Sequence, residues 1–505
     1  MTALETDSGS VDAALERDAA SWRDPRGFVF RRGGRVYRQI GRGHAGEWTA
    51  FAGSDFARGL VDTGRLLPWA DAPLDARLDD SAWAVIQPEQ LDFIAYPYEW
   101  TFGQLRDAAL LTLDIQSEAL AAGFSLRDAS AYNVQFRGVR PTLIDHLSFE
   151  RAVPDAPWIA YRQFCEHFLA PLSLMAWRDV RMGRMLRDQL DGIPLDLAAR
   201  LLPGRTRLRL GLGSHVHLHA RAQRQHADDG ARTSSARAGS DGTTAAGGEG
   251  STTTMGSEGS TTATNPGAPR LSAGRLKALL RGLRETVAGL RWDPSGTEWA
   301  DYADQDHASY QDAAHDVKAQ TTAAMLDAVG GRRAWDLGAN TGRYSRVAAD
   351  HGYRVLAFDI DPAAAERHYR SLVKDGRTET TPLVMDLADP SPSLGWAQRE
   401  RAGLLERANA DVVLALALIH HLAIGRNVPL PMVIDLFAQL APAAIVEWVP
   451  RGDPMVDRLL ASREDIFDTY TEAGFVAAAE RRFSIASRTP IEGSPRVLFE
   501  LRRNT

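Results

Sequence analysis

Two acidic residues and a glycine turn provide the clearest chemical signal in the chain. Residues 334–345, AWDLGANTGRYS, place Asp336 at the end of a short apolar stretch, before a turn that contains two glycines. Residues 351–362, HGYRVLAFDIDP, hold a second apolar stretch that ends in Asp359. Glycine lets a backbone approach a ligand closely, and an acid at the tip of the next strand can accept hydrogen bonds from both ribose hydroxyls. The pattern predicts a nucleoside site at the carboxyl ends of two parallel strands.

The glycine spacing narrows the kind of nucleoside. A dinucleotide fingerprint has the pattern G-x-G-x-x-G, which seats a pyrophosphate on the start of a helix. Here the pattern is D-L-G-x-N-x-G, with Asp336 before the first glycine. The acid would repel a pyrophosphate but suits a cationic amino-acid tail. A glycine turn in another kind of α/β protein is the alternative.

This loop resembles the cofactor loop of the class I S-adenosyl-L-methionine (SAM) methyltransferases, over roughly residues 299–501. The resemblance implies that SAM is the cofactor. It also implies which positions hold the cofactor. The methionine part would lie among Asp336, Gly338, Asn340 and Gly342, the ribose at Asp359, and the adenine at Asp386 and the backbone N–H of Leu387, with Ile360 as a further cofactor-binding residue. For Asp386, capping of a turn is the alternative.

The same resemblance places the acceptor at the exit of the stretch 410–422, ADVVLALALIHHL. No Asn/Asp-Pro-Pro-aromatic tetrapeptide occurs there, which argues against N-methylation of a base. His420 or His421 could deprotonate a hydroxyl or carboxyl acceptor, because imidazole titrates near neutrality. Glu447, at the end of the following apolar stretch, could orient the histidine or hold substrate. Histidines that only begin a helix are an equal alternative.

The alternation of strand and helix patterns from residue 332 onward predicts an α/β fold. We expect a Rossmann-like, doubly wound, seven-stranded sheet, closed by an antiparallel pair near the C-terminus. Ahead of the first strand, Trp299, Tyr302 and Tyr310 could form a lid over the cofactor together with Lys318. Packing of these aromatic residues in the core is the alternative.

The N-terminal part carries a second constellation. Residues 27–40 alternate apolar and polar around two glycines, which predicts a hairpin, and residues 101–123 form a helix pattern that Thr101 would cap. Asp128, Asn133 and Asp145 follow. Their spacing resembles the catalytic segment of protein-kinase-like and aminoglycoside-phosphotransferase-like folds, in which one Asp is the base and the Asn and second Asp hold magnesium.

The resemblance implies an α+β kinase-like domain, but the chain departs from the pattern. No lysine occurs before Lys277, and Arg38 is the nearest substitute for the residue that would pair nucleotide phosphates. Arginine does not replace lysine conservatively at such a site. A degenerate domain that binds or presents substrate is the main expectation. A working phosphotransferase, or a cluster in which Asp128 and Asn133 only cap turns, is the alternative.

Composition divides the chain. We expect a disordered lead at 1–24, the kinase-like domain at 25–215, a flexible low-complexity linker at 216–270 and the methyltransferase domain at 271–505, with separately folding halves. The basic amphipathic helix pattern at 271–292 is expected to pack onto the second domain, with binding to a partner or a membrane surface as the alternative.

The chain has 505 residues, a net charge of −7 and one cysteine, Cys165, which excludes an intramolecular disulfide and a cysteine metal cluster. No metal site is predicted. The start lacks a signal-peptide pattern and no apolar run is long enough to span a bilayer, so a cytoplasmic protein without a membrane partner is expected. The acidic balance disfavours bulk nucleic acid.

As a whole, the chain also resembles bacterial nodulation-type methyltransferases, on the segments LALALIHHLAI, YPYEW and DASAYNVQF. The expected function is methyl transfer from SAM to an unidentified acceptor, with the N-terminal domain assisting substrate recognition. A bifunctional methyltransferase and phosphotransferase, and a SAM-binding scaffold without turnover, are the alternatives.

Overall fold

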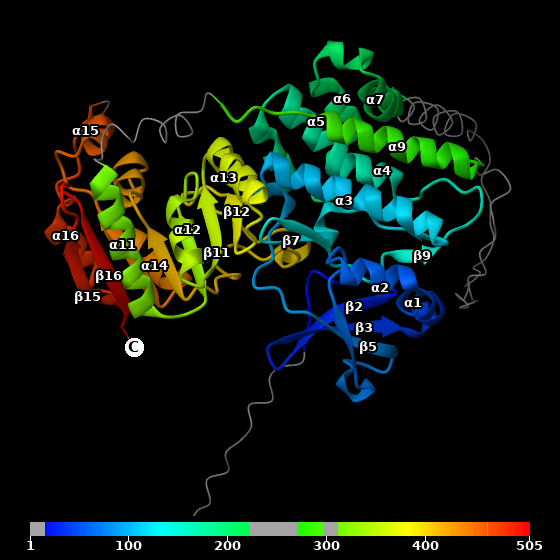
Figure 1. Cartoon of the computed structure of the whole chain (residues 1–505), viewed down its shortest axis with the longest axis horizontal. Helices are drawn as coiled ribbons and strands as arrows, with labels where there is room; N and C mark the ends of the chain where they lie inside the picture. Colours follow the sequence, from blue (N-terminus) through cyan, green and yellow to red (C-terminus); the bar gives the residue numbers. More distant parts are fainter. Residues whose placement is uncertain (1–15, 222–269, 296–311, 462, 505) are drawn as a thin grey trace, which may run out of the picture.

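The computed structural model describes residues 16–221, 270–295, 312–461 and 463–504. Most of the expected lead and linker, and the aromatic residues Trp299, Tyr302 and Tyr310, lie outside the described residues. Figure 1 shows the chain from 16 to 221 on one side and the chain from 312 to 504 on the other.

The N-terminal part begins with a five-stranded sheet in the order β1-β2-β3-β5-β4, antiparallel throughout. The predicted hairpin is confirmed, since β2 and β3 pair around Gly33 and Gly34, both with positive φ. Two helices, α1 and α2, follow β3. These elements are β1 (Glu16–Arg17), β2 (Gly27–Arg32), β3 (Arg35–Gly41), α1 (Ala45–Ala52), α2 (Asp55–Asp62), β4 (Trp69–Ala72) and β5 (Ala82–Pro88).

The long helix α3 (Phe102–Ala121) is also confirmed. Thr101 caps it by accepting a bond from the backbone N–H of Gln104, and the Gln104 side-chain oxygen accepts a bond from the Thr101 N–H. Such a reciprocal cap satisfies donors that the first turn of a helix leaves open. After α3, two small sheets pair β6 with β9 and β7 with β8. These strands are β6 (Phe124–Leu126), β7 (Val134–Arg137), β8 (Arg140–Leu143) and β9 (Phe149–Arg151).

A helical region completes the N-terminal part. It comprises α4 (Tyr161–Phe164), the π-helix η5 (Cys165–Leu169), α5 (Ala170–Trp177), the 3₁₀ helix η6 (Val180–Arg187), α6 (Leu195–Leu201), the 3₁₀ helix η7 (Gly204–Leu208), α7 (Leu210–Leu212) and the π-helix η8 (Gly213–Leu218). Cys165 is buried there as a free thiol.

The C-terminal part is built on a seven-stranded sheet in the order β12-β11-β10-β13-β14-β16-β15. The first five are parallel to one another, β16 pairs antiparallel with β14, and β15 pairs antiparallel with β16. The predicted doubly wound sheet and its closing antiparallel pair are confirmed. The strands are β10 (Arg333–Leu337), β11 (Arg354–Asp359), β12 (Thr380–Val384), β13 (Val412–Ala415), β14 (Ala443–Trp448), β15 (Phe483–Pro490) and β16 (Val497–Arg503).

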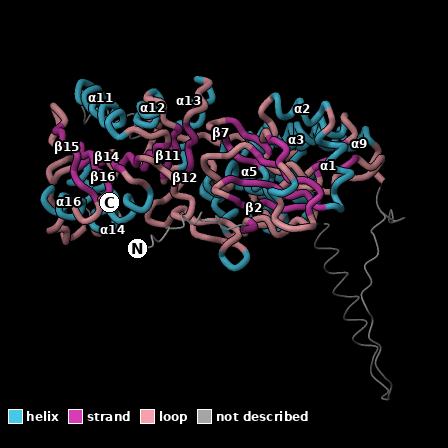
Figure 2. Tube along the Cα trace, turned by 90° about the horizontal axis from the view of Figure 1, so that it is seen from below, coloured by secondary structure: helices cyan, strands magenta, loops and turns pink. Residues whose placement is uncertain are grey.

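Helices cover both faces of this sheet. Figure 2 shows α11, α12 and α13 on one side of the strands and α14 and α16 on the other. Strand order reverses between β10 and β13, and ligands of open α/β sheets bind outside the carboxyl ends of the strands at such a point. The helices are α11 (Asp312–Val329), α12 (Arg343–Asp350), α13 (Pro362–Asp375), α14 (Leu430–Leu440), α15 (Pro454–Leu460) and α16 (Glu472–Ala479).

The two parts meet along a buried interface. Strand β12 and helix α13 face the N-terminal part in both views, and one apolar cluster continues from one part into the other. The ring centroids of Phe93 and Trp335 lie 5.5 Å apart, and the backbone N–H of Ala402 donates to the Tyr96 hydroxyl at 2.8 Å. Separate folding of the two halves stays a prediction, but in this structure they share a core.

The helix α9 (Ala273–Gly289) corrects one expectation. It was expected to pack onto the second domain, but it packs on α3 of the N-terminal part, where Arg284 pairs with Asp114 at 2.6 Å. Its apolar positions are Leu276, Leu280, Leu283 and Val287, and all four are buried. An amphipathic pattern shows that one helix face will be covered, but it does not say by which neighbour.

None of the helices in the described residues is both long enough and apolar enough to cross a membrane.

Candidate functional site

The turn after β10 is built as the glycine pattern predicts. Gly338 and Gly342 have φ of 73° and 84°, and Asn340 between them has φ of 49°. Glycine adopts such left-handed conformations without the steric cost that other residues incur. The N–H groups of Gly338 and Ala339 donate to the Phe358 carbonyl at 2.8 and 2.9 Å, so the turn folds back onto the end of β11.

The Asp359 carboxylate, at the end of β11, also holds the turn in place. It accepts from the Asn340 N–H at 2.7 Å and from the Asp361 N–H at 2.8 Å. Burial raises the pKa of Asp359 to about 6; the two backbone bonds oppose this shift, while the charges of Asp361 and Asp336 add to it. Each carboxylate oxygen has two lone pairs, so the oriented group keeps the capacity to accept further hydrogen bonds.

Asp336 lies deeper in the fold. It is 2% exposed and accepts a bond from the Ser345 hydroxyl, in the first turn of α12, at 2.6 Å. Burial raises the pKa of Asp336 to about 6, and Ser345 and the charge of Lys318 oppose that shift. The sheet therefore brings Asp336 and Asp359 to the same edge, on the adjacent strands β10 and β11.

The three remaining cofactor candidates lie along the same edge. Ile360 is 42% exposed beside Asp359. Asp386 is half-buried two residues beyond β12. It accepts from the Ala388 N–H at 2.9 Å and pairs with Arg426 at 3.1 Å, so it also caps a turn. Leu387 is half-buried next to it.

His420 and His421 follow β13, with ring centroids 4.0 Å apart. His420 is 1% exposed, and neither of its ring nitrogens has a hydrogen-bond partner among the described residues. Burial lowers the pKa of His420 well below its usual value, and His421, Arg496 and Lys318 add to the shift. Burial, with Arg496, lowers the pKa of His421 to about 4. Both imidazoles are therefore neutral at pH 7.

Glu447 on β14 belongs to a buried charged network that the sequence did not reveal. It is fully buried and accepts from the Lys318 ammonium at 2.6 Å. Arg496 approaches it at 3.5 Å and forms a two-pronged pair with Asp453 at 2.7 and 3.1 Å. The Lys318 ammonium also lies 4.4 Å from the centre of the Tyr344 ring.

The buried network gives Lys318 a different position from the one expected. Lys318 was considered as part of a lid, and it is instead 3% exposed and paired inside the site. Arg496 and Asp453 were not expected to act at the site. Only a weak signal could have found them, namely charged residues near the ends of apolar strands.

The kinase-like constellation also converges. Arg38 on β3 pairs with Asp145 at 2.5 Å, and both side chains are mostly buried. Burial raises the pKa of Asp128, and the neighbouring Asp145 carboxylate adds to the shift, while Asn133 opposes it. Burial would raise the pKa of Asp145 too, but Arg38 and Ser148 lower it overall. Residues from three separate segments thus meet at one point.

No family model matches the chain. Solved structures similar to it include SAM-dependent methyltransferases. Magnesium protoporphyrin IX methyltransferase from Synechocystis PCC 6803, solved with bound SAM, is 18% identical over 42% of this chain and 99% of its own, with a TM-score of 0.30. N-methyltransferase NodS from Bradyrhizobium japonicum WM9 is 11% identical over 39% of this chain and 99% of its own, with a TM-score of 0.29.

A curated relative covers the whole length. Nodulation protein NoeA of Rhizobium meliloti (strain 1021) is 36% identical over 505 residues, which span 99% of each chain. The alignment therefore extends over both the N-terminal part and the C-terminal part of the chain. The chain therefore belongs to the family of nodulation protein NoeA.

Proposed function

We propose that the C-terminal part is a SAM-dependent methyltransferase. The observation that carries the proposal is the edge of the sheet where β10 and β11 end. A left-handed glycine turn there lies against two buried acids, Asp336 and Asp359, on adjacent parallel strands. An acid at the tip of the second strand suits two ribose hydroxyls.

The residues present fit this cofactor. Asp359 is held by two backbone N–H groups and retains lone pairs for the ribose. Ile360 offers an exposed apolar side chain beside it, on which an adenine could lie. Asp336 would supply negative charge toward the amino-acid end, and Asp386 with the Leu387 N–H would meet the adenine edge. When bound, SAM supplies a methyl group on a sulfonium, which is a good leaving group.

The residues that follow β13 and β14 would receive the acceptor. A neutral imidazole can accept a hydrogen bond from an acceptor hydroxyl through one ring nitrogen, or donate one to an acceptor carboxylate through the other. His421, with a pKa of about 4, abstracts a proton poorly at pH 7, and burial lowers the pKa of His420 as well. Orientation of the acceptor is therefore the role we assign to both histidines. Lys318 holds Glu447 in place at the back of this site. Positioning of the acceptor would supply most of the rate enhancement.

Calorimetry with S-adenosylhomocysteine tests the cofactor assignment. We expect wild-type protein to bind it and Asp359→Asn to bind at least about tenfold more weakly, because a hydrogen bond to a charged group contributes about 1.5–3 kcal/mol. Ribose hydroxyls favour the charged form of Asp359, whose pKa is about 6 in the free protein. The affinity for S-adenosylhomocysteine should therefore be independent of pH above pH 7. It should fall as the pH drops through 6, by up to about tenfold per pH unit.

Asp375→Asn, at the exposed far end of α13, is the matched control and should bind like the wild type. The proposal is wrong if the wild type releases no heat with S-adenosylhomocysteine, or if Asp359→Asn binds unchanged. Labelled SAM with fractionated cell extract then identifies the acceptor. Tight cofactor binding with no labelled product in any fraction would favour a scaffold instead.

The N-terminal cluster supports a second candidate, a phosphotransferase in a kinase-like domain. The favouring observation is the convergence of Asp128, Asn133 and Asp145. Against it, Arg38 forms a close pair with Asp145, where a lysine would be expected to bridge phosphates. We therefore assign this part to substrate recognition and keep phosphate transfer as the alternative.

ATP turnover separates the two assignments. With Mg²⁺ and labelled ATP, we expect the wild type to show no more turnover than Asp145→Ala, because the Arg38 guanidinium already neutralises that carboxylate. Turnover by the wild type that disappears in Asp145→Ala would establish the phosphotransferase instead. Circular dichroism of both proteins would show whether the substitution leaves the fold intact.

A further inference from the structure

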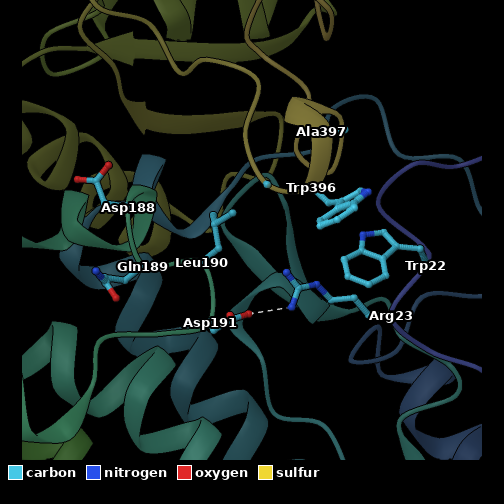
Figure 3. A pocket seen from close by; sticks show the side chains of 9 residues that line it. Trp22, Arg23, Asp188, Gln189, Leu190, Asp191, Trp396 and Ala397 are labelled. Atoms are coloured by element: carbon cyan, nitrogen blue, oxygen red, sulfur yellow. Dashed lines mark hydrogen bonds and ion pairs between the residues drawn. The ribbon is translucent and has the colours of Figure 1, made fainter.

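A surface cavity lies where three distant segments of the chain meet. Its volume is about 460 Å³, and it is lined by Trp22 and Arg23, by residues 188–191 and by residues 395–397. Figure 3 shows the Trp22 and Trp396 side chains together at one end of it. Sites for small molecules have volumes of about 300–1,000 Å³ and often occur where domains meet. This cavity has both properties, and none of its lining residues is among the cofactor candidates described above.

Two exposed tryptophans dominate the cavity. Trp22 is 45% exposed and Trp396 is 74% exposed, and their ring centroids lie 6.1 Å apart at an interplanar angle of 51°. The rings therefore form an open wedge. Large aromatic side chains held at the surface in this way typically mark a binding site.

The loop that carries Trp396 is built to present it. Gly395, Ala397 and Gln398 all have positive φ, of 79°, 54° and 58°. Side chains other than glycine rarely adopt this conformation, and strained residues of this kind cluster at ligand sites. A Cβ on Gly395 would lie 2.5 Å from the Cβ of Glu400, so the loop packs closely on that residue.

Glu400 holds both tryptophan segments at once. It is 1% exposed and accepts from the Trp396 N–H at 3.2 Å and from Arg23 at 2.7 and 3.2 Å. Arg23 also donates to Asp191 at 3.0 Å. Although burial alone would raise the pKa of Glu400, the bond from Arg23 lowers it overall. The ion pairs fix the cavity walls in relation to one another.

The charge of the cavity indicates what it would bind. Arg23 is shared between two carboxylates, those of Glu400 and Asp191, so an anionic ligand would meet no free positive charge from it. The guanidinium lies 4.9 Å from the centre of the Trp22 ring and occupies the place where a cationic ligand would stack. Asp188 adds a further carboxylate to the lining, so the site disfavours an anionic ligand. A neutral ligand avoids both this repulsion and competition with Arg23 for the Trp22 ring.

We propose that this cavity binds a neutral sugar ring. The apolar C–H face of a pyranose would lie against the tryptophan wedge. Arg23 uses three of its five N–H donors in the bonds to Glu400 and Asp191. The remaining two donors, together with the exposed Asp191 carboxylate, are placed to bond ring hydroxyls. A pyranose thus offers an apolar face to the two tryptophans and hydroxyls to the polar groups of Arg23 and Asp191.

Titration of the full-length protein with neutral disaccharides tests the proposal. Cellobiose, maltose and lactose are the probes, with an array of neutral glycans to widen the set. Tryptophan fluorescence and saturation-transfer NMR report binding. We expect at least one neutral glycan to bind, and Trp396→Ala to weaken it by at least about tenfold because a stacking surface is lost. Trp83→Ala is the matched control, since Trp83 is 42% exposed on β5 and does not line the cavity.

The proposal is overturned if no neutral glycan binds, or if Trp396→Ala binds as well as the wild type. Preferential binding of choline would show a site for cations, and preferential binding of sugar phosphates would show a site for anions; either would overturn the neutral assignment. The titrations need no SAM, so their outcome is independent of the methyltransferase proposal.

Discussion

Replacing Arg407 with alanine is expected to lower the free energy of unfolding by about 3–5 kcal/mol, because it leaves a buried charge without its partner. The Arg407 guanidinium bonds both oxygens of Glu99, at 2.5 and 3.0 Å, and the Ile94 carbonyl at 2.6 Å. The side chains are 6% and 0% exposed. This ion pair joins the N-terminal part to the C-terminal part, 308 residues apart in sequence.

Urea unfolding followed by circular dichroism measures this loss. Arg488→Ala is the control, because its pair with Glu472 lies at the surface, with side chains 47% and 35% exposed, and surface pairs contribute about 0–1 kcal/mol. The double variant Arg407→Leu with Glu99→Leu should recover part of the loss, since it leaves no unpaired charge. A change below about 1 kcal/mol for Arg407→Ala would contradict the view that this contact stabilises the junction.

The local parts of the C-terminal fold could be predicted from the sequence. Apolar runs that end in Asp336 and Asp359 specified two buried strands, and the glycines between them specified a turn with positive φ. Both signals act within a few residues. The alignment of β10 with β11 then follows, because consecutive strands in a doubly wound sheet run parallel and end at one edge.

Contacts between distant residues could not be predicted in this way. The Lys318–Glu447 pair spans 129 residues and the Arg496–Asp453 pair spans 43. Nothing in the local pattern says which acid a buried base will meet. The partner of α9 was predicted wrongly for the same reason. The helix sequence shows which of its faces is apolar, but it does not specify that α3 will cover that face.

The helix α13 depends on both local sequence signals and contacts between distant residues. It begins directly after the strand that ends in Asp359, and it also contacts the N-terminal part. The Gly103 N–H donates to Glu366 at 2.7 Å, and the Tyr369 hydroxyl donates to Asp107 at 2.7 Å. Contacts with α3 therefore hold the same helix whose start faces the proposed cofactor. This arrangement gives the N-terminal part a physical route to influence that site.

Substitution of Gly342 by alanine is expected to lower the affinity for S-adenosylhomocysteine by more than about a hundredfold. A Cβ at this position would lie 2.0 Å from Nε2 of His368, on α13, and the backbone has φ of 84°. His368 is 2% exposed, so it has little room to move. The left-handed conformation adds about 1–2 kcal/mol for any residue with a Cβ. The turn must shift, and with it the backbone that would lie along the cofactor.

Gly352→Ala separates strain from collision. Gly352 has the same φ of 84°, but its added Cβ would meet no atom within 4 Å. Calorimetry with S-adenosylhomocysteine should therefore find near wild-type affinity for Gly352→Ala and a large loss for Gly342→Ala. If the collision with His368 causes the loss, adding His368→Ala to Gly342→Ala should restore part of the affinity. Wild-type affinity in Gly342→Ala alone would mean that this turn does not contact the cofactor.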